Sequence, residues 1–418
     1  MSAPPAAAPG SAPGPVLGWR TPLLVIIAGC TIALLNFGVR SGFGLFLEPI
    51  SIANGWGREV FAFGIAIQTV LWGFGQPFAG AIADRYGSAR VLAVGALLYA
   101  GGVALTAYAA TPLMLNLTLG VLLGMGLAGT SFTVALAAIA RMVSPERRSW
   151  ALGLGTAAGS MGQFLMVPLS QGFIAAWGWQ TALLLLSLFA LAIIPLSSAL
   201  AGKAVEGGGP KQSMGEALKE AGNQKSYWLL ISGFFVCGFH VSFIQTHLPA
   251  YIVDRGLDPQ TGAWALALVG LANVVGSYTA GVLGGKRSKK YLLSFIYAAR
   301  AVVIAVFVML PMTQVSVLIF AFAMGLLWLS TVPLTSGLVA QIFGPRYMAT
   351  LFGIVFFSHQ VGGFLGVWLG GRLFDASGSY DVVWWISTGL AIFAAIVHWP
   401  IDERPLVRAP APAAAAAE

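Results

Sequence analysis

The sequence predicts an all-α membrane protein in which twelve helices cross the bilayer as two pseudo-symmetric six-helix bundles. The first observation is composition, because the 418 residues are 58% hydrophobic and only 9% charged. A soluble domain carries roughly a quarter charged residues. The second observation is that the apolar residues form long runs, each near the ~20 residues that a helix needs to cross a bilayer. The third is an internal repeat.

The repeat relates the two halves of the chain by a constant shift of 200 positions. The residues that recur are Gly38 as Gly238, Phe43 as Phe243, Pro49 as Pro249, Pro145 as Pro345, Gly153 as Gly353, Gly162 as Gly362 and Phe164 as Phe364. Such a chain is two copies of one unit. Duplicated helix bundles with a site between the halves, near the bilayer midplane, are typical of secondary transporters.

The expected spans fall into two groups of six, with boundaries good to a few residues. The first group is 21–47, 59–83, 90–110, 112–142, 149–171 and 178–200, which form an N-terminal bundle over 21–200. The second is 227–253, 261–285, 290–310, 313–343, 348–373 and 382–402, which form a C-terminal bundle over 227–402. Outer-membrane barrels are excluded, because their strands alternate in polarity over about ten residues.

The segments outside the bundles are polar or of low complexity. Residues 1–20 are rich in Ala, Pro, Gly and Ser, and 403–418 end in Pro and Ala, so both are expected to be disordered tails. The N-terminus lacks a basic region and a cleavage site, so the first span serves as its own insertion signal. In the 201–226 linker, Ser213 and Glu216 form a capping-box pattern for a short surface helix. A disordered tether is the open alternative.

The positive charges predict the orientation. Of the 22 lysines and arginines, seventeen fall on one side of the predicted spans, three on the other and two inside spans. The three are Arg58, Arg255 and Arg372, and the two are Arg40 and Arg300. Because cytoplasmic loops carry the excess of Lys and Arg, both termini are expected in the cytoplasm of a multi-pass inner-membrane protein. The same bias accounts for the net charge of +8 without a nucleic-acid partner.

A short motif follows the second span. The chain reads Gly80-Ala-Ile-Ala-Asp84-Arg85-Tyr-Gly87-Ser-Ala-Arg90, with an acid in a short turn flanked by arginines. An acid there suits the positive end of a neighbouring helix. The motif resembles the G-x-x-x-D-R-x-G-x-R signature of the major facilitator superfamily. The resemblance implies the major facilitator fold and a role for Gly80, Asp84, Arg85, Gly87 and Arg90 in conformational gating.

Further stretches resemble the bacterial members of the monocarboxylate transporter branch of that superfamily. The end of the first span, from Arg40 to Glu48, has the branch's basic residue followed by Ser, a small-aromatic run and Glu. Thr246-His247-Leu-Pro-Ala-Tyr251, Trp328-Leu-Ser-Thr-Val-Pro333 and Ser358-His359-Gln360 are also similar. Where the branch usually has an Asp and an Arg in the eighth span, this chain has Asn273 and Ser277. The usual lactate- or pyruvate-like substrate therefore does not follow from the resemblance.

Ionisable residues inside spans are costly and by default functional. They are Arg40, Arg300, His240, His247, His359 and His398. No Asp or Glu lies deep in any predicted span, since Glu48, Glu59, Asp254 and Asp402 lie at ends. An interior with cations and no carboxylate favours an anion, which argues against the drug-cation exporters of the same superfamily.

Arg40, with Asn36 one turn earlier, is the leading substrate-binding candidate, because a guanidinium binds a carboxylate through two hydrogen bonds. The alternative is an arginine that reaches outward to the membrane interface. The repeat pairs Arg40 with His240, and His247 follows two helical turns later on nearly the same face. We expect these residues to converge on one cavity, with His240 or His247 carrying a coupled proton. Hydrogen-bonded core histidines are the open alternative.

Other polar residues are weaker candidates. His359 and Gln360 in the eleventh span and Trp328 in the tenth are expected to line the site, with core packing as the alternative for Trp328. Arg300 lies in a peripheral span of the resembled fold, so we expect it to bind carbonyls or polar groups of neighbouring helices. His398, near the end of the last span, is expected at the membrane interface.

The sequence thus predicts a secondary active transporter that moves a small organic anion by alternating access, coupled to a proton. It is expected to be a monomer in the bilayer, without a cofactor or metal, and no nucleotide-binding P-loop is present. A proton-independent anion exchanger and a carrier of neutral metabolites remain alternatives. From other classes, a nutrient sensor of transporter ancestry would carry a long extension. An enzyme would need a catalytic constellation that the sequence lacks.

Overall fold

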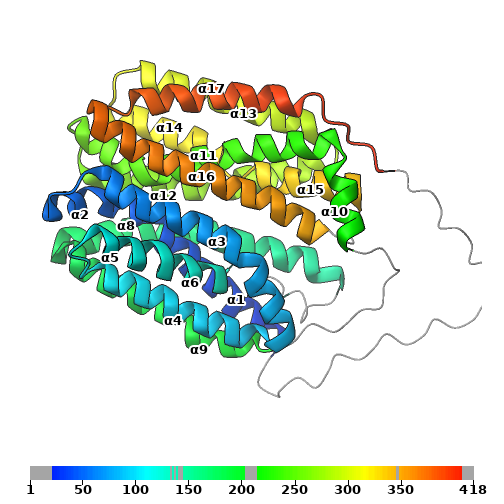
Figure 1. The fold of residues 1–418 in the computed structure, drawn as a ribbon, viewed down its shortest axis with the longest axis horizontal. Coiled ribbons are helices and arrows are strands. Elements are labelled where there is room, and N and C mark those ends of the chain that lie inside the picture. The colour runs from blue at the N-terminus through cyan, green and yellow to red at the C-terminus, as the bar shows by residue number, and fades with distance from the viewer. Residues whose placement is uncertain are drawn as a thin grey trace, which may run out of the picture.

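The computed structural model describes residues 21–131, 134, 135, 138, 139, 145–202, 214–344 and 348–406. These residues form α-helices with short 3-10 and π turns, and no strand occurs among them. The ribbon divides into an N-terminal half (Pro22–Leu200) and a C-terminal half (Lys225–His398), which lie against one another with their long helices nearly parallel (Figure 1). The predicted tail 1–20, residues 407–418 of the predicted tail 403–418, and residues 203–213 of the predicted linker 201–226 lie outside the described residues.

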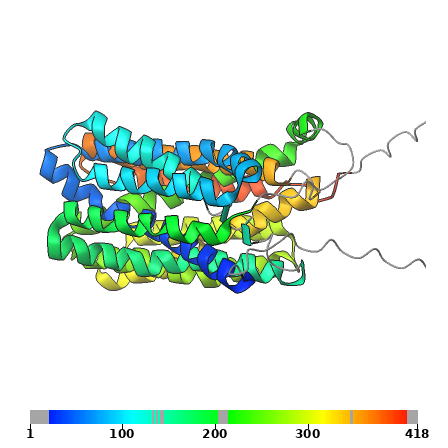
Figure 2. The ribbon, with the colours of Figure 1, turned by 90° about the horizontal axis from the view of Figure 1, so that it is seen from below.

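The two ends of the bundle are distinguished by the chain segments that meet there. We call the end where α1 (Pro22–Ser41) begins and α17 (Asp381–His398) finishes the tail face, and the end with the turns 55–57, 255–258 and 378–380 the distal face. In both views the start of α1 and the end of α17 lie at the same end of the bundle (Figures 1 and 2). The linker helix α10, at Met214–Gly222, also lies there, so the short helix expected after Ser213 is present.

The described part of the N-terminal half contains eleven elements, of which nine come before its last two short helices. They are α1 (Pro22–Ser41), η1 (Phe43–Phe46), α2 (Leu47–Asn54), α3 (Arg58–Tyr86), α4 (Ser88–Thr106), α5 (Pro112–Leu115) with the π turn η2 (Asn116–Leu122), α6 (Leu123–Gly129) and α8 (Pro145–Leu191). The half ends with two short helices, α9 (Ile193–Ser197) and η3 (Ser198–Leu200). Thr21 caps α1 by accepting a hydrogen bond from the Leu24 amide, and Pro22 fits the first turn, where an amide hydrogen has no helical partner.

The C-terminal half has fewer breaks. Its helices are α11 (Lys225–Asp254), α12 (Pro259–Gly284), α13 (Lys289–Met309), α14 (Gln314–Leu327), α15 (Thr331–Phe343), α16 (Met348–Ser377) and α17 (Asp381–His398). Asp258 caps α12, and Thr313 and Ser316 form a capping box at α14. The tenth expected span therefore consists of α14 and α15, separated by a break at Trp328–Ser330.

Eleven helical stretches of the described chain are long and apolar enough to cross a membrane, and one of them accounts for two expected spans. Gly153–Leu200 is 48 residues long. It bends at Gly178, whose backbone (φ 79°, ψ 163°) is not helical, so two helices meet there. The fifth and sixth spans, expected as 149–171 and 178–200, are thus joined without a loop. The predicted all-α fold of two bundles is confirmed.

The repeated glycines have one packing role in both halves. A Cβ atom at Gly38 would lie 2.7 Å from the Gly162 carbonyl oxygen of α8. At the equivalent place, a Cβ at Gly238 would clash with the His359 carbonyl of α16, and one at Gly362 with the Phe235 carbonyl of α11. Small residues let helix backbones approach closely in membranes. The repeat in the sequence therefore records the same close helix pair, α1 with α8 and α11 with α16.

Two helix pairs join the halves. α3 packs against α16, and α12 packs against α8. The repeat relates the second span to the eighth and the fifth span to the eleventh. The contact between spans two and eleven is therefore the pseudo-symmetric equivalent of the contact between spans eight and five. α11 also meets η1 of the first span. The middle of the molecule is thus enclosed by α1, α3, α11 and α16, and any site there is built by both halves.

Candidate binding site between the halves

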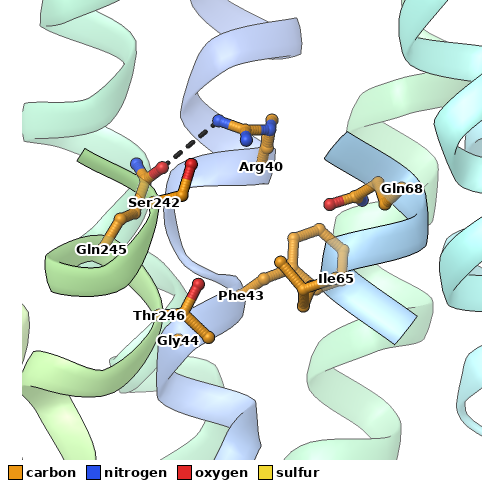
Figure 3. A pocket seen from close by; sticks show the side chains of 8 residues that line it. All are labelled: Arg40, Phe43, Gly44, Ile65, Gln68, Ser242, Gln245 and Thr246. Atoms are coloured by element: carbon orange, nitrogen blue, oxygen red, sulfur yellow. Dashed lines mark hydrogen bonds between the residues drawn. The ribbon is translucent and has the colours of Figure 1, made fainter. Parts of the chain in front are cut away.

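A small cavity lies where the broken first span meets α3 and α11. It is lined by Arg40, Phe43, Gly44, Ile65 and Gln68 of the N-terminal half and by Ser242, Gln245 and Thr246 of the C-terminal half (Figure 3). The cavity measures about 10 Å³, which is room for about one water molecule. A larger solute can enter only if the surrounding helices move apart.

The break in the first span brings the halves together at this cavity. α1 ends at Ser41, and the chain continues as the 3-10 turn Phe43–Phe46 before α2 begins. Gly44 in this turn lies directly against α11, where a Cβ atom would clash with the Gln245 carbonyl and lie 2.9 Å from the Thr246 carbonyl. Only glycine fits this close approach without displacing one of the two backbones.

Arg40 is the only charged residue among the eight that line the cavity. Its side chain is 8% exposed, its Nη1 donates a hydrogen bond to Gln245 Oε1 at 3.2 Å, and its guanidinium lies 4.6 Å from the Trp72 ring centroid. Gln68 faces Arg40 across the cavity (Figure 3). The position inside the protein excludes the alternative in which Arg40 reaches outward to the membrane interface.

Several hydrogen-bond donors at this cavity have no acceptor. The buried nitrogen atoms without a hydrogen bond include Arg40 Nε, Gln68 Nε2 and Gln245 Nε2, and also Trp72 Nε1 beside the guanidinium. Because Gln245 Oε1 accepts from Arg40, the amide nitrogen of Gln245 must point elsewhere. Buried polar groups without a partner are costly and call for an explanation. A site rich in donors and carrying one positive charge suits an anion.

Asn36 does not reach the cavity. Its amide nitrogen donates to Thr130 Oγ1 at 2.5 Å, and its backbone carbonyl accepts from the Tyr99 hydroxyl at 3.0 Å. Both partners belong to the N-terminal half. Asn36 therefore holds α1 against the third and fourth spans, one turn away from Arg40, and is not a lining residue in this conformation.

The structure does not bring His240 and His247 to Arg40. Both imidazoles are fully buried inside the C-terminal half. His240 Nε2 lies 2.8 Å from the Ser387 carbonyl of α17, and His247 Nε2 lies 2.8 Å from the Val367 carbonyl of α16. The ring of His240, the equivalent of Arg40 in the repeat, points into its own bundle. The expected convergence of the three side chains is absent from this conformation.

His359 and Gln360 lie at the contact between α16 and α3. His359 Nδ1 is 3.0 Å from Gln360 Oε1, and the ring stacks on Phe356. Gln360 Nε2 donates to the Thr69 carbonyl at 3.2 Å, across the two halves. Since Thr69 is adjacent to Gln68, Gln360 lies beside the cavity without lining it.

Trp328 and Arg300 meet at the break in the tenth span, away from the cavity. Arg300 Nη2 donates to the carbonyls of Leu327 (2.7 Å) and Trp328, which the break leaves without helical partners. The expectation that Arg300 binds carbonyls of neighbouring helices is confirmed. Trp328 is fully buried in the core, in line with the packing alternative. His398 is the last residue of α17, where it is fully buried and stacks on Tyr297.

Asn273 and Ser277, which stand where the resembled branch has Asp and Arg, form structural hydrogen bonds. Asn273 donates to Ser160 Oγ of α8 at 2.9 Å and accepts from Ser277 Oγ and from the Leu329 amide, both at 2.9 Å. One amide thus joins α12 to the opposite half and to the break in the tenth span.

The distal face is closed by contacts between the halves, which we call the distal clamp. Arg58, at the start of α3, forms two hydrogen bonds of 2.6 Å with the Asp254 carboxylate at the end of α11. Arg58 Nη1 also donates to the Tyr380 hydroxyl at 3.1 Å, and its guanidinium lies 3.9 Å from the Phe374 ring centroid. Asp375 of α16 accepts the backbone amides of Arg58 and Glu59 at 2.9 and 2.8 Å and so caps α3.

The outer rim of the distal clamp involves Glu59. Its carboxylate accepts from Trp368 Nε1 and from Arg372 Nη1, both at 3.0 Å. Arg372 is exposed, so this ion pair is weaker than the half-buried pair of Arg58. Burial raises the pKa of Tyr380 above its ordinary value, so the phenol stays protonated and can donate a hydrogen bond.

The predicted gating residues lie at the tail face, between α3 and α4. Gly87 (φ 99°) is the single residue between the two helices, and its amide donates to the Ala83 carbonyl at 2.8 Å. Arg85 and Arg90 are exposed, and a Cβ at Gly80 would have no neighbour within 4 Å. The side chain of Asp84 lies outside the described residues.

Sequence reasoning missed most of the residues that line the cavity and the whole distal clamp. Gln68, Ser242 and Gln245 are neutral and so were not among the ionisable residues of the spans. The sequence feature that could have indicated them is their polarity, since they are polar residues inside apolar runs. Arg58 and Asp254 were treated only as charges at span ends. The sequence feature that could have indicated this pair is two opposite charges that fall on the same side of the membrane, in helices of different halves.

Two bundles of membrane-spanning helices with a polar site between them are the architecture typical of secondary transporters. Residues 29–367 match the Major Facilitator Superfamily, and the chain belongs to this family of transporters. Monocarboxylate transporter 13 of Rattus norvegicus is 28% identical over 380 residues, which cover 87% of this chain and 84% of that protein. The uncharacterized MFS-type transporter YcxA of Bacillus subtilis is 24% identical over 359 residues, which cover 82% of this chain and 86% of that protein.

Solved structures agree with the fold. A bacterial homologue of the human lysosomal transporter Spinster, in an inward-facing and unoccupied conformation, matches with a TM-score of 0.72 over 95% of this chain and 100% of its own, at 16% identity. The nucleoside transporter NupG matches with a TM-score of 0.75 over 90% of this chain and 99% of its own, at 14% identity. At such identities the likeness concerns the fold alone.

Proposed function

We propose that this transporter moves a small organic anion, with a carboxylate as the charged group, through the cavity at Arg40. The observation that carries the proposal is a buried guanidinium accompanied by amide donors without acceptors, in a cavity built by both halves. A carboxylate would accept hydrogen bonds from Arg40 and from the amides of Gln68 and Gln245. The similarity to monocarboxylate transporters supports the same class of substrate.

The proposed cycle is alternating access with the tail face in the cytoplasm. The charge bias of the loops supports this orientation. In the present conformation the distal clamp closes the outer face, and the cavity is too small for a carboxylate of several atoms. Binding therefore requires separation of α3 and α11 around Arg40. The gating motif from Gly80 to Arg90 would act at the other face.

We further propose that transport is coupled to a proton, as in a symporter. Arg40 cannot carry that proton, because a guanidinium stays charged at any working pH. A proton-independent exchanger and a carrier of neutral metabolites are the competing functions, and a nutrient sensor is the competing class. Counterflow of labelled solute in proteoliposomes, with and without a pH gradient, separates these functions.

The experiment that tests the charge of the substrate is a ligand screen on the purified protein. Thermal-shift measurements would compare small carboxylates, each paired with its uncharged carboxamide as a matched control. We expect carboxylates to stabilise the protein, since ligand at 100 times its Kd adds about 2.7 kcal/mol, and the amides to have little effect. Equal stabilisation by an acid and its amide would contradict an anion site.

A further inference from the structure

We infer that His247 is the proton-binding site and that its protonation opens the distal clamp. This inference rests on the proposed proton coupling and names its location. The observation behind it is a continuous chain of hydrogen bonds that runs from the backbone of α16 through His247 and Tyr380 to Arg58, and so crosses from one half to the other.

The direction of every hydrogen bond in this chain is determined. The Val367 carbonyl can only accept, so His247 Nε2, at 2.8 Å, donates to it. Nδ1 of the neutral ring is then an acceptor, and it takes the Tyr380 hydroxyl proton at 3.0 Å. The Tyr380 oxygen in turn accepts from Arg58 Nη1 at 3.1 Å. The closed clamp therefore holds His247 as one neutral tautomer.

A second proton on His247 would disturb this arrangement. It would turn Nδ1 into a donor, so the Tyr380 hydroxyl could no longer donate to the ring. It would also place a positive charge one hydroxyl group away from Arg58, in a region where His247 is fully buried. Like charges at short range and burial both disfavour the charged form.

Four carboxylates around the distal clamp already have partners, so they compensate little for that charge. Asp254 of α11 binds Arg58, Asp375 of α16 accepts two backbone amides of α3, and Asp381 at the start of α17 pairs with Arg255 at 3.3 Å. Glu59 of α3 binds Arg372. Gly370 of α16 lies directly against the His247 ring and has no side chain there.

The consequence follows from linkage. Because the closed clamp disfavours the protonated imidazole, proton uptake at His247 favours a conformation in which the ring is released and the halves separate. The clamp is then fully stable above the ordinary imidazole pKa of about 6.5 and weakens as the pH falls below it. With the distal face outward, external acid would open the site to the outside, the direction expected of proton-coupled uptake.

His240 provides an internal comparison. It is an equally buried imidazole on the same helix, and its Nε2 likewise contacts a backbone carbonyl, that of Ser387. Ser387 belongs to the same half as His240, and the His240 side chain has no hydrogen bond to the distal clamp. Protonation of His240 thus has no direct path to the contact between the halves.

The test measures the opening of the clamp without any substrate. Spin labels at the exposed residues Ala53 and Ala376, which lie in opposite halves at the distal face, would report their separation by pulsed electron resonance in a Cys30→Ala background. We expect the population with the longer distance to grow by up to tenfold per pH unit below about pH 6.5. His247→Gln, which can still donate to Val367 and accept from Tyr380, should keep the short distance at every pH.

The control variants make the outcome specific. Tyr380→Phe removes the hydroxyl that links the ring to Arg58 and should weaken the pH response, whereas His240→Gln and Arg255→Gln should keep it in full. A wild type whose distances ignore pH, or a His247→Gln variant with the full response, would overturn the inference. If the clamp responds to pH through His247 but no anion binds at Arg40, the proposed substrate fails while this inference stands.

Discussion

Arg40 and Arg300 are both guanidinium groups buried inside spans, yet their surroundings differ. Arg300 is fully buried and donates to the Leu327 and Trp328 carbonyls of a broken helix. Arg40 has one hydrogen-bond partner, Gln245, and an adjacent cavity with further free donors. Both guanidinium groups keep nitrogen atoms without a partner, Nε and Nη1 in Arg300 and Nε in Arg40, but only Arg40 lies at a cavity with further free donors from both halves. This difference supports our proposal that Arg40 binds the substrate.

Substitution of Arg40 should abolish transport without unfolding the protein. In Arg40→Ala the substrate loses its buried charge partner, which costs about 2–5 kcal/mol or roughly 30- to 5,000-fold in affinity. Arg40→Lys should be intermediate, because an ammonium keeps the charge but not the two-pronged geometry. Uptake in proteoliposomes measures the effect, with Arg255→Gln as a surface control. Wild-type uptake by Arg40→Ala would refute the assignment.

Substitution of Arg300 should have the opposite profile. Arg300→Ala leaves two buried carbonyls without a donor, and each lost partner costs about 1–3 kcal/mol. We therefore expect a lower melting temperature of the purified protein, while the carboxylate affinity of the folded fraction stays near that of the wild type. If the variant were as stable as the wild type but failed to bind carboxylate, Arg300 would belong to the binding site.

At the scale of helices, two spans are broken, and at each break the backbone contacts another part of the protein. The first span turns at Gly42–Phe46, which presents Gly44 to α11. The tenth breaks at Trp328–Ser330, where Arg300 binds the carbonyls and Asn273 binds the Leu329 amide. Irregular backbone inside a membrane protein is tolerated only where such partners satisfy it. Breaks of this kind cannot be read from hydrophobicity.

The repeated glycines allow a direct test of the helix pairs. Gly238→Ala would push against the His359 carbonyl, and overpacking of this kind costs about 1–3 kcal/mol. Gly353→Ala, on α16 with no atom within 4 Å of an added Cβ, is the matched control and should be neutral. Thermal unfolding of the two variants would be compared. Equal melting temperatures would show that α11 and α16 are not held at this distance in solution.

At the scale of the whole molecule, function depends on how the two halves contact one another. α3 with α16 and α8 with α12 form the pseudo-symmetric joint, and the Arg40 cavity lies within it. The distal clamp closes one end through Arg58 and Asp254. Since a rigid bundle moves as a unit, small changes at these contacts shift the balance between conformations rather than the chemistry of the cavity.

The gating motif at the tail face should affect the rate of this exchange and not the affinity. Asp84→Asn removes the negative charge of the motif, so we expect transport to slow while substrate binding at equilibrium stays within about twofold, because the cavity at Arg40 is unchanged. Uptake rate and binding isotherm would be measured on the same preparation. A large loss of affinity with normal turnover would assign Asp84 to the binding site.

The sequence by itself determined the membrane class, the two-bundle fold and the family. These features follow from long apolar runs, a repeat of 200 positions and the Gly80–Arg90 motif, and each is a property of local segments. It also singled out Arg40 and assigned Arg300 to the neighbouring carbonyls. The sequence could single out these two residues because burying an isolated charge in a membrane is costly. A charged residue inside a span is therefore expected to have a structural or functional role.

Only the tertiary structure decided which way the polar side chains point. The repeat paired His240 with Arg40, but helix rotation turned the ring toward Ser387, and His247 became part of a chain that ends at Arg58. Gln68, Gln245 and the Arg58–Asp254 pair come from segments far apart in sequence. Their meeting depends on how the two bundles pack, because contacts between halves are set by the rotation and spacing of whole helices and leave no periodic trace in the chain.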